Sequence, residues 1–208
     1  MGIGQNVQKF DLQLYLRSRF IDKGYKVSQI GTKKISGLFG LHPLPDFLFN
    51  TQYSDVDKVY AFNRVMKDVS MQEKPDVILL GIPDSLLPLN NKHRFSFGLY
   101  AYEIFNAVQP DFVITSLMAN DGYNDEFYSE ISKMAKYKYN VNIDAYFVSQ
   151  FCPLSNSIWS EKLSYVYLPQ MELPKTEYKV YTTSDLNNDI LFKQEEKKLL
   201  LYGKYEQY

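Results

Sequence analysis

Apolar residues along the chain follow two spacings, one typical of helices and one typical of strands. Recurrence every three or four positions predicts helices over residues 7–21, 55–72, 95–108, 124–137 and 185–201. Short apolar runs between them predict strands over residues 25–31, 75–81, 110–117, 141–149 and 163–168. Asp55 stands where the second helix needs an N-cap, and Gly24 where the first needs a C-terminal glycine.

Strands that alternate with helices in this way indicate an α/β fold with a parallel sheet between two layers of helices, three layers in all. We expect this domain to span residues 1–174, followed by a polar C-terminal tail over 175–208 with a helix packed on or beside it. In parallel sheets, ligands bind beyond the carboxyl ends of the strands. The segments 1–9, 31–40, 81–93, 117–124 and 149–157 are expected at those ends.

Composition narrows the class of protein. The 208 residues carry a net charge of −1, which argues against a general nucleic-acid binder, because such proteins need a basic face for phosphates. Cys152 is the single cysteine, so an internal disulfide and a multi-cysteine metal centre are excluded. A reducing, cytoplasmic location is the default expectation, and no apolar run approaches the roughly 20 residues of a membrane span.

The first residues resemble a phosphate-binding loop. Gly2 and Gly4 allow a tight turn before a helix, and backbone N–H groups at a helix start bind phosphate. A standard Walker A loop has Gly-Lys-Ser/Thr here, whereas this chain has Gln8 before Lys9 and Phe10 in place of the hydroxyl residue that holds magnesium. We therefore expect a degenerate loop that binds the phosphate groups of a nucleotide but hydrolyses the nucleotide poorly. Its predicted contacts are Gly2, Gly4, Gln5, Asn6 and Lys9.

Two features of this loop leave alternatives open. A glycine turn can also start a helix without binding any ligand. A phosphate loop normally follows a central strand, and no strand-forming residues stand before Gly2. We therefore expect a sheet that lacks its first strand, either because the native chain begins upstream or because this chain is a shortened product.

Two further candidate contacts follow predicted strands. Asp84 comes just after the run that ends at Gly81, where a carboxylate can reach magnesium through water or can close a turn after Pro83. Thr32 follows Gly31 at the end of an earlier strand and is a second candidate contact for a nucleotide.

The remaining reactive side chains have simpler explanations. Asp11 complements the positive end of the first helix, and Cys152, without a partner base, is expected to pack as a small core residue. His42 and His93 stand in separate long loops and are too few for a metal centre. No catalytic residue and no metal ligand is therefore predicted.

Several motifs resemble a known family. They are Gly2-Ile-Gly-Gln-Asn6 with Lys9-Phe10, Leu12-Gln-Leu14, the run from Gly24 to Thr32, Leu38-Phe-Gly40, the run from Lys74 to Pro83, Pro88, Asn90-Asn91, Phe97-Gly98 and Tyr102-Glu103. Together they resemble the clostridial peptide maturation system proteins encoded beside radical-SAM enzymes in natural-product gene clusters. The resemblance spans most of residues 2–170 and implies a deviant P-loop NTPase-like fold, a further region before the loop, and a role in peptide maturation.

These observations predict an accessory protein in the maturation of a ribosomally made peptide. The expected cofactor of the loop is ATP or GTP with magnesium, and the expected partner is a precursor peptide or a radical-SAM maturation enzyme. The alternative is a non-enzymatic interaction module that recruits one of those partners. The radical chemistry itself is not expected here, since the chain has no cysteine triplet.

Overall fold

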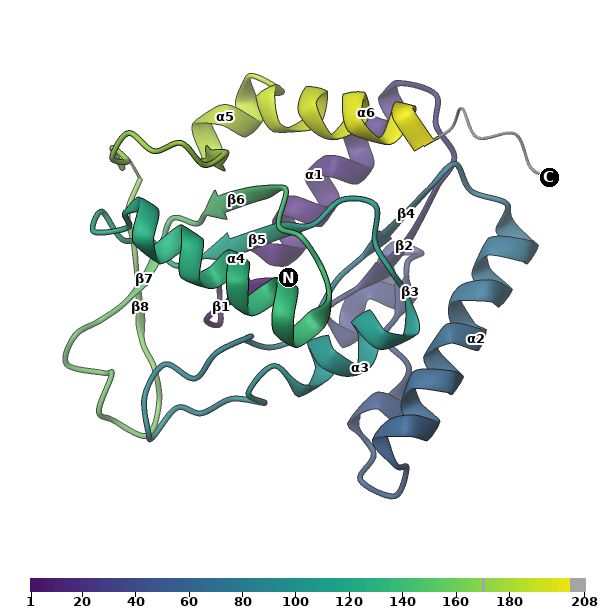
Figure 1. Cartoon of the computed structure of the whole chain (residues 1–208), viewed down its shortest axis with the longest axis horizontal. Coiled ribbons are helices and arrows are strands. Elements are labelled where there is room, and N and C mark those ends of the chain that lie inside the picture. Colours follow the sequence, from purple (N-terminus) through teal and green to yellow (C-terminus); the bar gives the residue numbers. More distant parts are fainter. Residues whose placement is uncertain (170, 203–208) are drawn as a thin grey trace.

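Parallel strands lie between two layers of helices (Figure 1). The computed structural model describes residues 1–169 and 171–202. The helices are α1 (Lys9–Asp22), α2 (Asp55–Glu73), α3 (Leu99–Ala107), α4 (Asp125–Tyr139), α5 (Thr183–Asn187) and α6 (Ile190–Tyr202), with short 3₁₀ helices at Lys34–Phe39 and Asp46–Phe49. The strands are β1 (Gly2–Ile3), β2 (Val27–Gly31), β3 (His42–Pro43), β4 (Val77–Leu80), β5 (Ile114–Leu117), β6 (Ala145–Val148), β7 (Phe151–Pro153), β8 (Tyr165–Tyr167) and β9 (Val180–Tyr181).

The strands form two parallel sheets and one hairpin. One sheet has the order β1-β5-β6-β9 and the other the order β3-β2-β4, whereas β7 and β8 pair antiparallel. In the first sheet Gly2 lies opposite Ser116 and Ile3 opposite Leu117, so β1 joins the sheet beside β5. A parallel α/β fold with flanking helices was predicted and is confirmed.

Two apolar layers cover the sheets. On one side α1, α5 and α6 pack on β4, β6 and β9 through a cluster that includes Phe20, Leu79 and Phe147. On the other side α2, α3 and α4 pack around Phe62 and Ile104. Successive residues of β4 enter opposite clusters, which is the arrangement expected of a strand buried on both faces.

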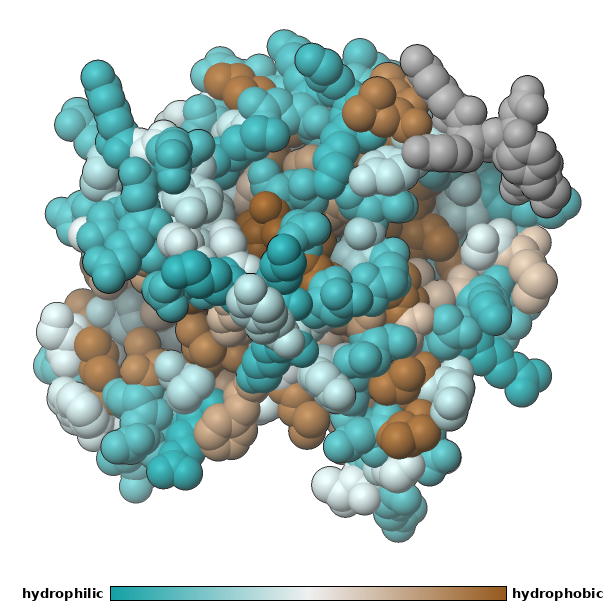
Figure 2. All heavy atoms as spheres, in the orientation of Figure 1, coloured by the Kyte–Doolittle hydropathy of each residue, from teal (hydrophilic) through white to brown (hydrophobic). Residues whose placement is uncertain are grey.

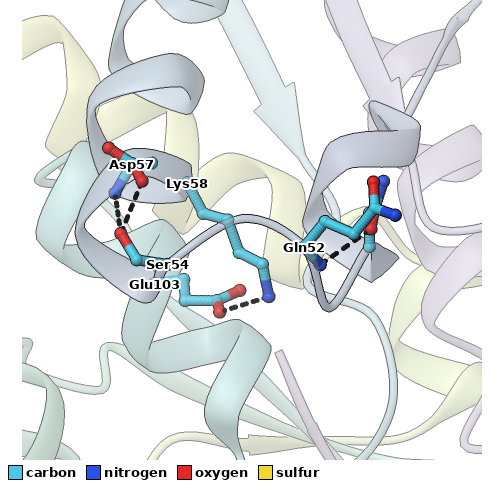
Figure 3. A network of polar contacts seen from close by, with 6 residues as sticks. Gln52, Ser54, Asp57, Lys58 and Glu103 are labelled. Carbon is cyan, nitrogen blue, oxygen red and sulfur yellow. Dashed lines mark hydrogen bonds and ion pairs between the residues drawn. The ribbon is translucent and has the colours of Figure 1, made fainter.

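A buried ion pair joins α2 to α3 (Figure 3). The Lys58 ammonium lies 3.1 Å from the Glu103 carboxylate, and their side chains are 8% and 0% exposed. Next to this pair, the Ser54 hydroxyl accepts a hydrogen bond from the Asp57 N–H at 3.2 Å and caps α2. The prediction that Asp55 is the cap was therefore wrong by one residue.

Two predicted helices differ from the observed ones for local reasons. The helix expected from residue 95 begins only at Leu99, because Phe95 and Phe97 have φ of 51° and 54°, outside the helical region. The helix expected over residues 185–201 is divided into α5 and α6, because Asp189 has φ of 57° between them. Among the helices of the described ranges, none is both long and apolar enough to cross a bilayer.

Four short strands were not predicted. β1, β3 and β9 have two residues each and β7 has three, too few for a pattern to be recognised. β9 pairs with β6 at the outer edge of the four-stranded sheet, so residues beyond 174 contribute to that sheet.

Candidate functional site

Residues 4–8 connect β1 to α1 through a tight turn. Gly4, Asn6 and Gln8 have positive φ of 98°, 54° and 52°, whereas the residues between them do not. Such alternation turns successive N–H groups to one side, as in the concave nests that bind anions. Gly4 must be glycine here, since a Cβ at this position would lie 2.8 Å from the Cγ of Met118.

Most backbone N–H groups of this loop are free. The first hydrogen bond of α1 runs from the Leu12 N–H to the Gln8 carbonyl at 2.9 Å, and Gln8 provides no side-chain cap. Within the described residues, the N–H groups of residues 5–8 donate no hydrogen bond. Unsatisfied N–H groups at the positive end of a helix dipole attract phosphate and carboxylate groups. The loop therefore has the backbone chemistry of an anion site.

Lys9, the first residue of α1, turns back along β1. Its aliphatic chain covers Gly2, where a Cβ would lie 2.8 Å from the Lys9 Cδ, and its ammonium donates a hydrogen bond to the Asp84 carbonyl. Burial lowers the pKa of Lys9 to about 8, although the nearby Asp84 carboxylate opposes the shift. The side chain remains mainly cationic at neutral pH and lies next to the loop, with its ammonium held by Asp84.

Asp84 meets the loop from the segment after β4. Its Oδ1 accepts a hydrogen bond from the Gln5 side chain at 3.4 Å, and its Oδ2 accepts one from the Ser96 N–H at 2.8 Å. Its backbone has φ of 57°. These contacts are those of a turn residue, and a magnesium-binding role for the carboxylate stays a prediction.

The structure brings together five of the seven predicted contacts: Gly2, Gly4, Gln5, Lys9 and Asp84. Asn6 is exposed at the tip of the turn. Thr32 lies at the end of β2 beside Gly81, where a glycine Cβ would meet its Cγ2 at 2.4 Å. Among the described residues, no hydrogen bond joins Thr32 to the loop.

Two residues that hold the loop were not predicted. The Ser85 hydroxyl accepts a hydrogen bond from the Gly4 N–H at 2.7 Å and donates one to the Leu87 carbonyl at 2.7 Å. Gln150 is the second of these residues, and its N–H donates a hydrogen bond to the Gln8 side chain at 2.8 Å. Ser85 follows Asp84 directly, and that adjacency is the one signal that pointed to it.

The histidines and the cysteine lie elsewhere. His42 contacts Glu73 at 2.5 Å, His93 contacts the Ser160 carbonyl at 3.0 Å, and Cys152 is half-buried in β7. Across the described ranges, no three His, Cys, Asp or Glu side chains gather in a way that would hold a metal ion.

Comparison with protein-family models, with curated proteins and with solved structures found no significant match. The resemblance to the peptide maturation proteins therefore rests on the motifs of this chain alone. What the protein does has to be argued from the loop and its surroundings.

Proposed function

We propose that this chain is an accessory protein of peptide maturation whose loop, residues 4–9, binds a nucleotide or another phosphate compound. The proposed fold is P-loop NTPase-like, with the strand before the loop reduced to β1. ATP or GTP with magnesium is the proposed ligand, and a precursor peptide or a radical-SAM maturation enzyme is the proposed partner.

The observation that carries this proposal is the row of free N–H groups in residues 5–8 at the start of α1. An anion there would accept hydrogen bonds from several amides at once and would meet the positive end of the helix dipole. The ammonium of Lys9 adds a positive charge beside the same turn. These three elements favour a phosphate group over a neutral ligand.

The loop is proposed to bind rather than to hydrolyse. Phe10 and Asp11 follow Lys9, so the hydroxyl that holds magnesium in a Walker A loop is missing. The Asp84 carboxylate, which the Gln5 side chain contacts, already accepts a hydrogen bond from the Ser96 N–H. Without a well-placed metal, the charge that develops in phosphoryl transfer would lack its main stabiliser.

Isothermal titration of ATP and of GTP, each with magnesium, tests the proposal. We expect binding with a dissociation constant of about 1 mM or tighter, weakened at least tenfold by Lys9→Ala. Lys67→Ala is the matched control, because it removes the same charge from an exposed position on α2. No heat and no thermal shift at about 1 mM nucleotide would overturn the proposal.

A second candidate, a non-enzymatic interaction module, is favoured by apolar side chains that reach the surface. Leu38, Phe39 and Trp159 are 86%, 56% and 70% exposed, and Figure 2 shows apolar patches between polar ones on one face. Where such side chains form a contiguous exposed patch, the patch commonly serves partner binding. Association with a neighbouring-gene product that survives Lys9→Ala but is lost in Trp159→Ser would support this candidate over nucleotide binding.

A further inference from the structure

A cavity of about 620 Å³ lies between β4 and β5. Residues 77–81 line it from the side of β4, and Val113, Ile114 and Ser116 line it from the side of β5. Leu16 of α1 closes it from one helical layer, and Phe105 of α3 closes it from the other. The cavity therefore occupies the sheet layer itself, in the gap between the two parallel sheets.

β1 leads directly into this cavity. The Met1 nitrogen donates a hydrogen bond to the Ile114 carbonyl at 2.8 Å, and the Ser116 N–H donates one to the Met1 carbonyl at 3.0 Å. On the other side of β1, the Leu86 N–H donates to the Gly2 carbonyl at 2.9 Å. β1 thus lies between β5 and the segment after β4, and its N-terminal direction points along the gap.

The edges of the gap need a partner. In the described chain β4 pairs with β2 alone, and β5 pairs with β1 only from Ser116 onward. Backbone N–H and C=O groups on a buried strand edge cost free energy when they have no hydrogen-bond partner. An added strand would satisfy both edges at once.

Two buried ionisable groups line the same cavity. Burial, together with the charge of Lys9, lowers the pKa of the Met1 ammonium to about 5. Glu195 of α6 is 5% exposed, and its Oε2 has no hydrogen-bond partner among the described residues. An amide nitrogen at Met1 would avoid burying an amine.

We propose that this cavity is a strand site, filled by an apolar extended segment that continues β1 beyond the nitrogen of Met1. The two sheets then form one continuous parallel sheet in the order β3-β2-β4-β1-β5-β6-β9. Continuity with the β1–β5 ladder favours a covalently joined segment over a separate peptide. Apolar clusters on both faces favour a continuous Val/Ile run, the pattern of a central parallel strand. The proposal goes beyond phosphate binding and does not depend on it.

The test adds about five residues, Val-Ile-Val-Val-Ile, directly before Met1 of the full chain. The matched control, Val-Pro-Val-Pro-Ile, keeps the apolar character but removes two N–H donors from the ladder. We expect the first extension to raise Tm by about 5–10 °C and the control to leave it almost unchanged. If the first extension causes aggregation, a less hydrophobic one, Lys-Val-Thr-Val-Val, replaces it and is also expected to raise Tm.

Hydrogen exchange shows which strands the added segment protects. The amides of Val77–Leu80 and of residues 113–114 are expected to exchange at least tenfold more slowly in the extended protein. Equal stabilisation by the proline control would overturn the proposal, as would an extension that leaves both Tm and exchange unchanged. Protection by the free Val-Ile peptide, but not by the extension, would assign the cavity to a separate partner instead. None of these readouts involves a nucleotide, so their failure would leave the phosphate proposal standing.

Discussion

Glu195, on α6, allows a quantitative test of the cavity between β4 and β5. Burial, with the negative charge of Asp144, raises the pKa of Glu195 to about 8. Asp144 is itself paired with the ammonium of Lys198. The Met1 ammonium and Lys9 also line the cavity. Glu195→Gln removes the titration while keeping the size of the side chain.

The sign of the effect follows from proton binding. In the unfolded chain the carboxyl group has a pKa of 4.5, so between pH 4.5 and about 8 the folded state retains a proton that the unfolded state has lost. The stability contributed by Glu195 is therefore complete below pH 4.5 and is lost as the pH rises to about 8. A pKa change from 4.5 to about 8 corresponds to about 5 kcal/mol.

Urea unfolding of both proteins from about pH 5 to about pH 9 measures this loss. Subtracting the two profiles removes the contributions of Met1 and Lys9, because both proteins share them. We expect the wild-type protein to lose about 4 kcal/mol relative to Glu195→Gln across this range, because the titration starts above the unfolded pKa of 4.5. Glu130→Gln, at a side chain that is 65% exposed, is the control and should run parallel to the wild-type protein. Parallel profiles for Glu195→Gln as well would refute the reasoning.

Three further predictions concern packing and the loop. Glu103→Leu should destabilise the protein by about 3–5 kcal/mol in urea unfolding because it leaves Lys58 buried and unpaired, and Lys58→Met in the same chain should restore most of the loss; a double variant no more stable than the single one would contradict this. Gly4→Val, strained at φ of 98° and 2.8 Å from Met118, should cost about 1–3 kcal/mol and abolish nucleotide binding by calorimetry, and unchanged affinity would exclude the loop as the site. Ser85→Ala should cost about 1–3 kcal/mol because the buried Gly4 N–H loses its acceptor, a loss that thermal unfolding would reveal and that an unchanged Tm would rule out.

The long elements could be predicted because their patterns are local. The apolar run at residues 75–81 indicated a strand covered on both faces, and β4 is such a strand. The start of α3 could not be predicted in the same way, because the apolar spacing of the helix already begins at residue 95, whereas Phe95 and Phe97 have positive φ. β9 has only two residues and depends on pairing with β6, which no local signal encodes.

In the candidate site, too, residues that are adjacent in the sequence could be predicted and distant ones could not. The glycines and Lys9 were recognisable because they follow one another in the order of a known loop. Ser85 and Gln150 hold the same loop from 81 and 142 residues away, and only the folded chain brings them to it. The missing first strand stays a prediction, and the cavity between β4 and β5 could not be predicted, because its walls and buried charges depend on all the surrounding elements.

The position of β1 also sets an order of assembly. The strands β2, β3 and β4 come from one continuous stretch of chain, and β5, β6 and β9 come from a later one. Met1 makes its hydrogen bond to Ile114, 113 residues away. Because such distant contacts form slowly, each half is expected to fold locally before β1 inserts between them. During synthesis the loop would then reach its final shape only after β5 has left the ribosome.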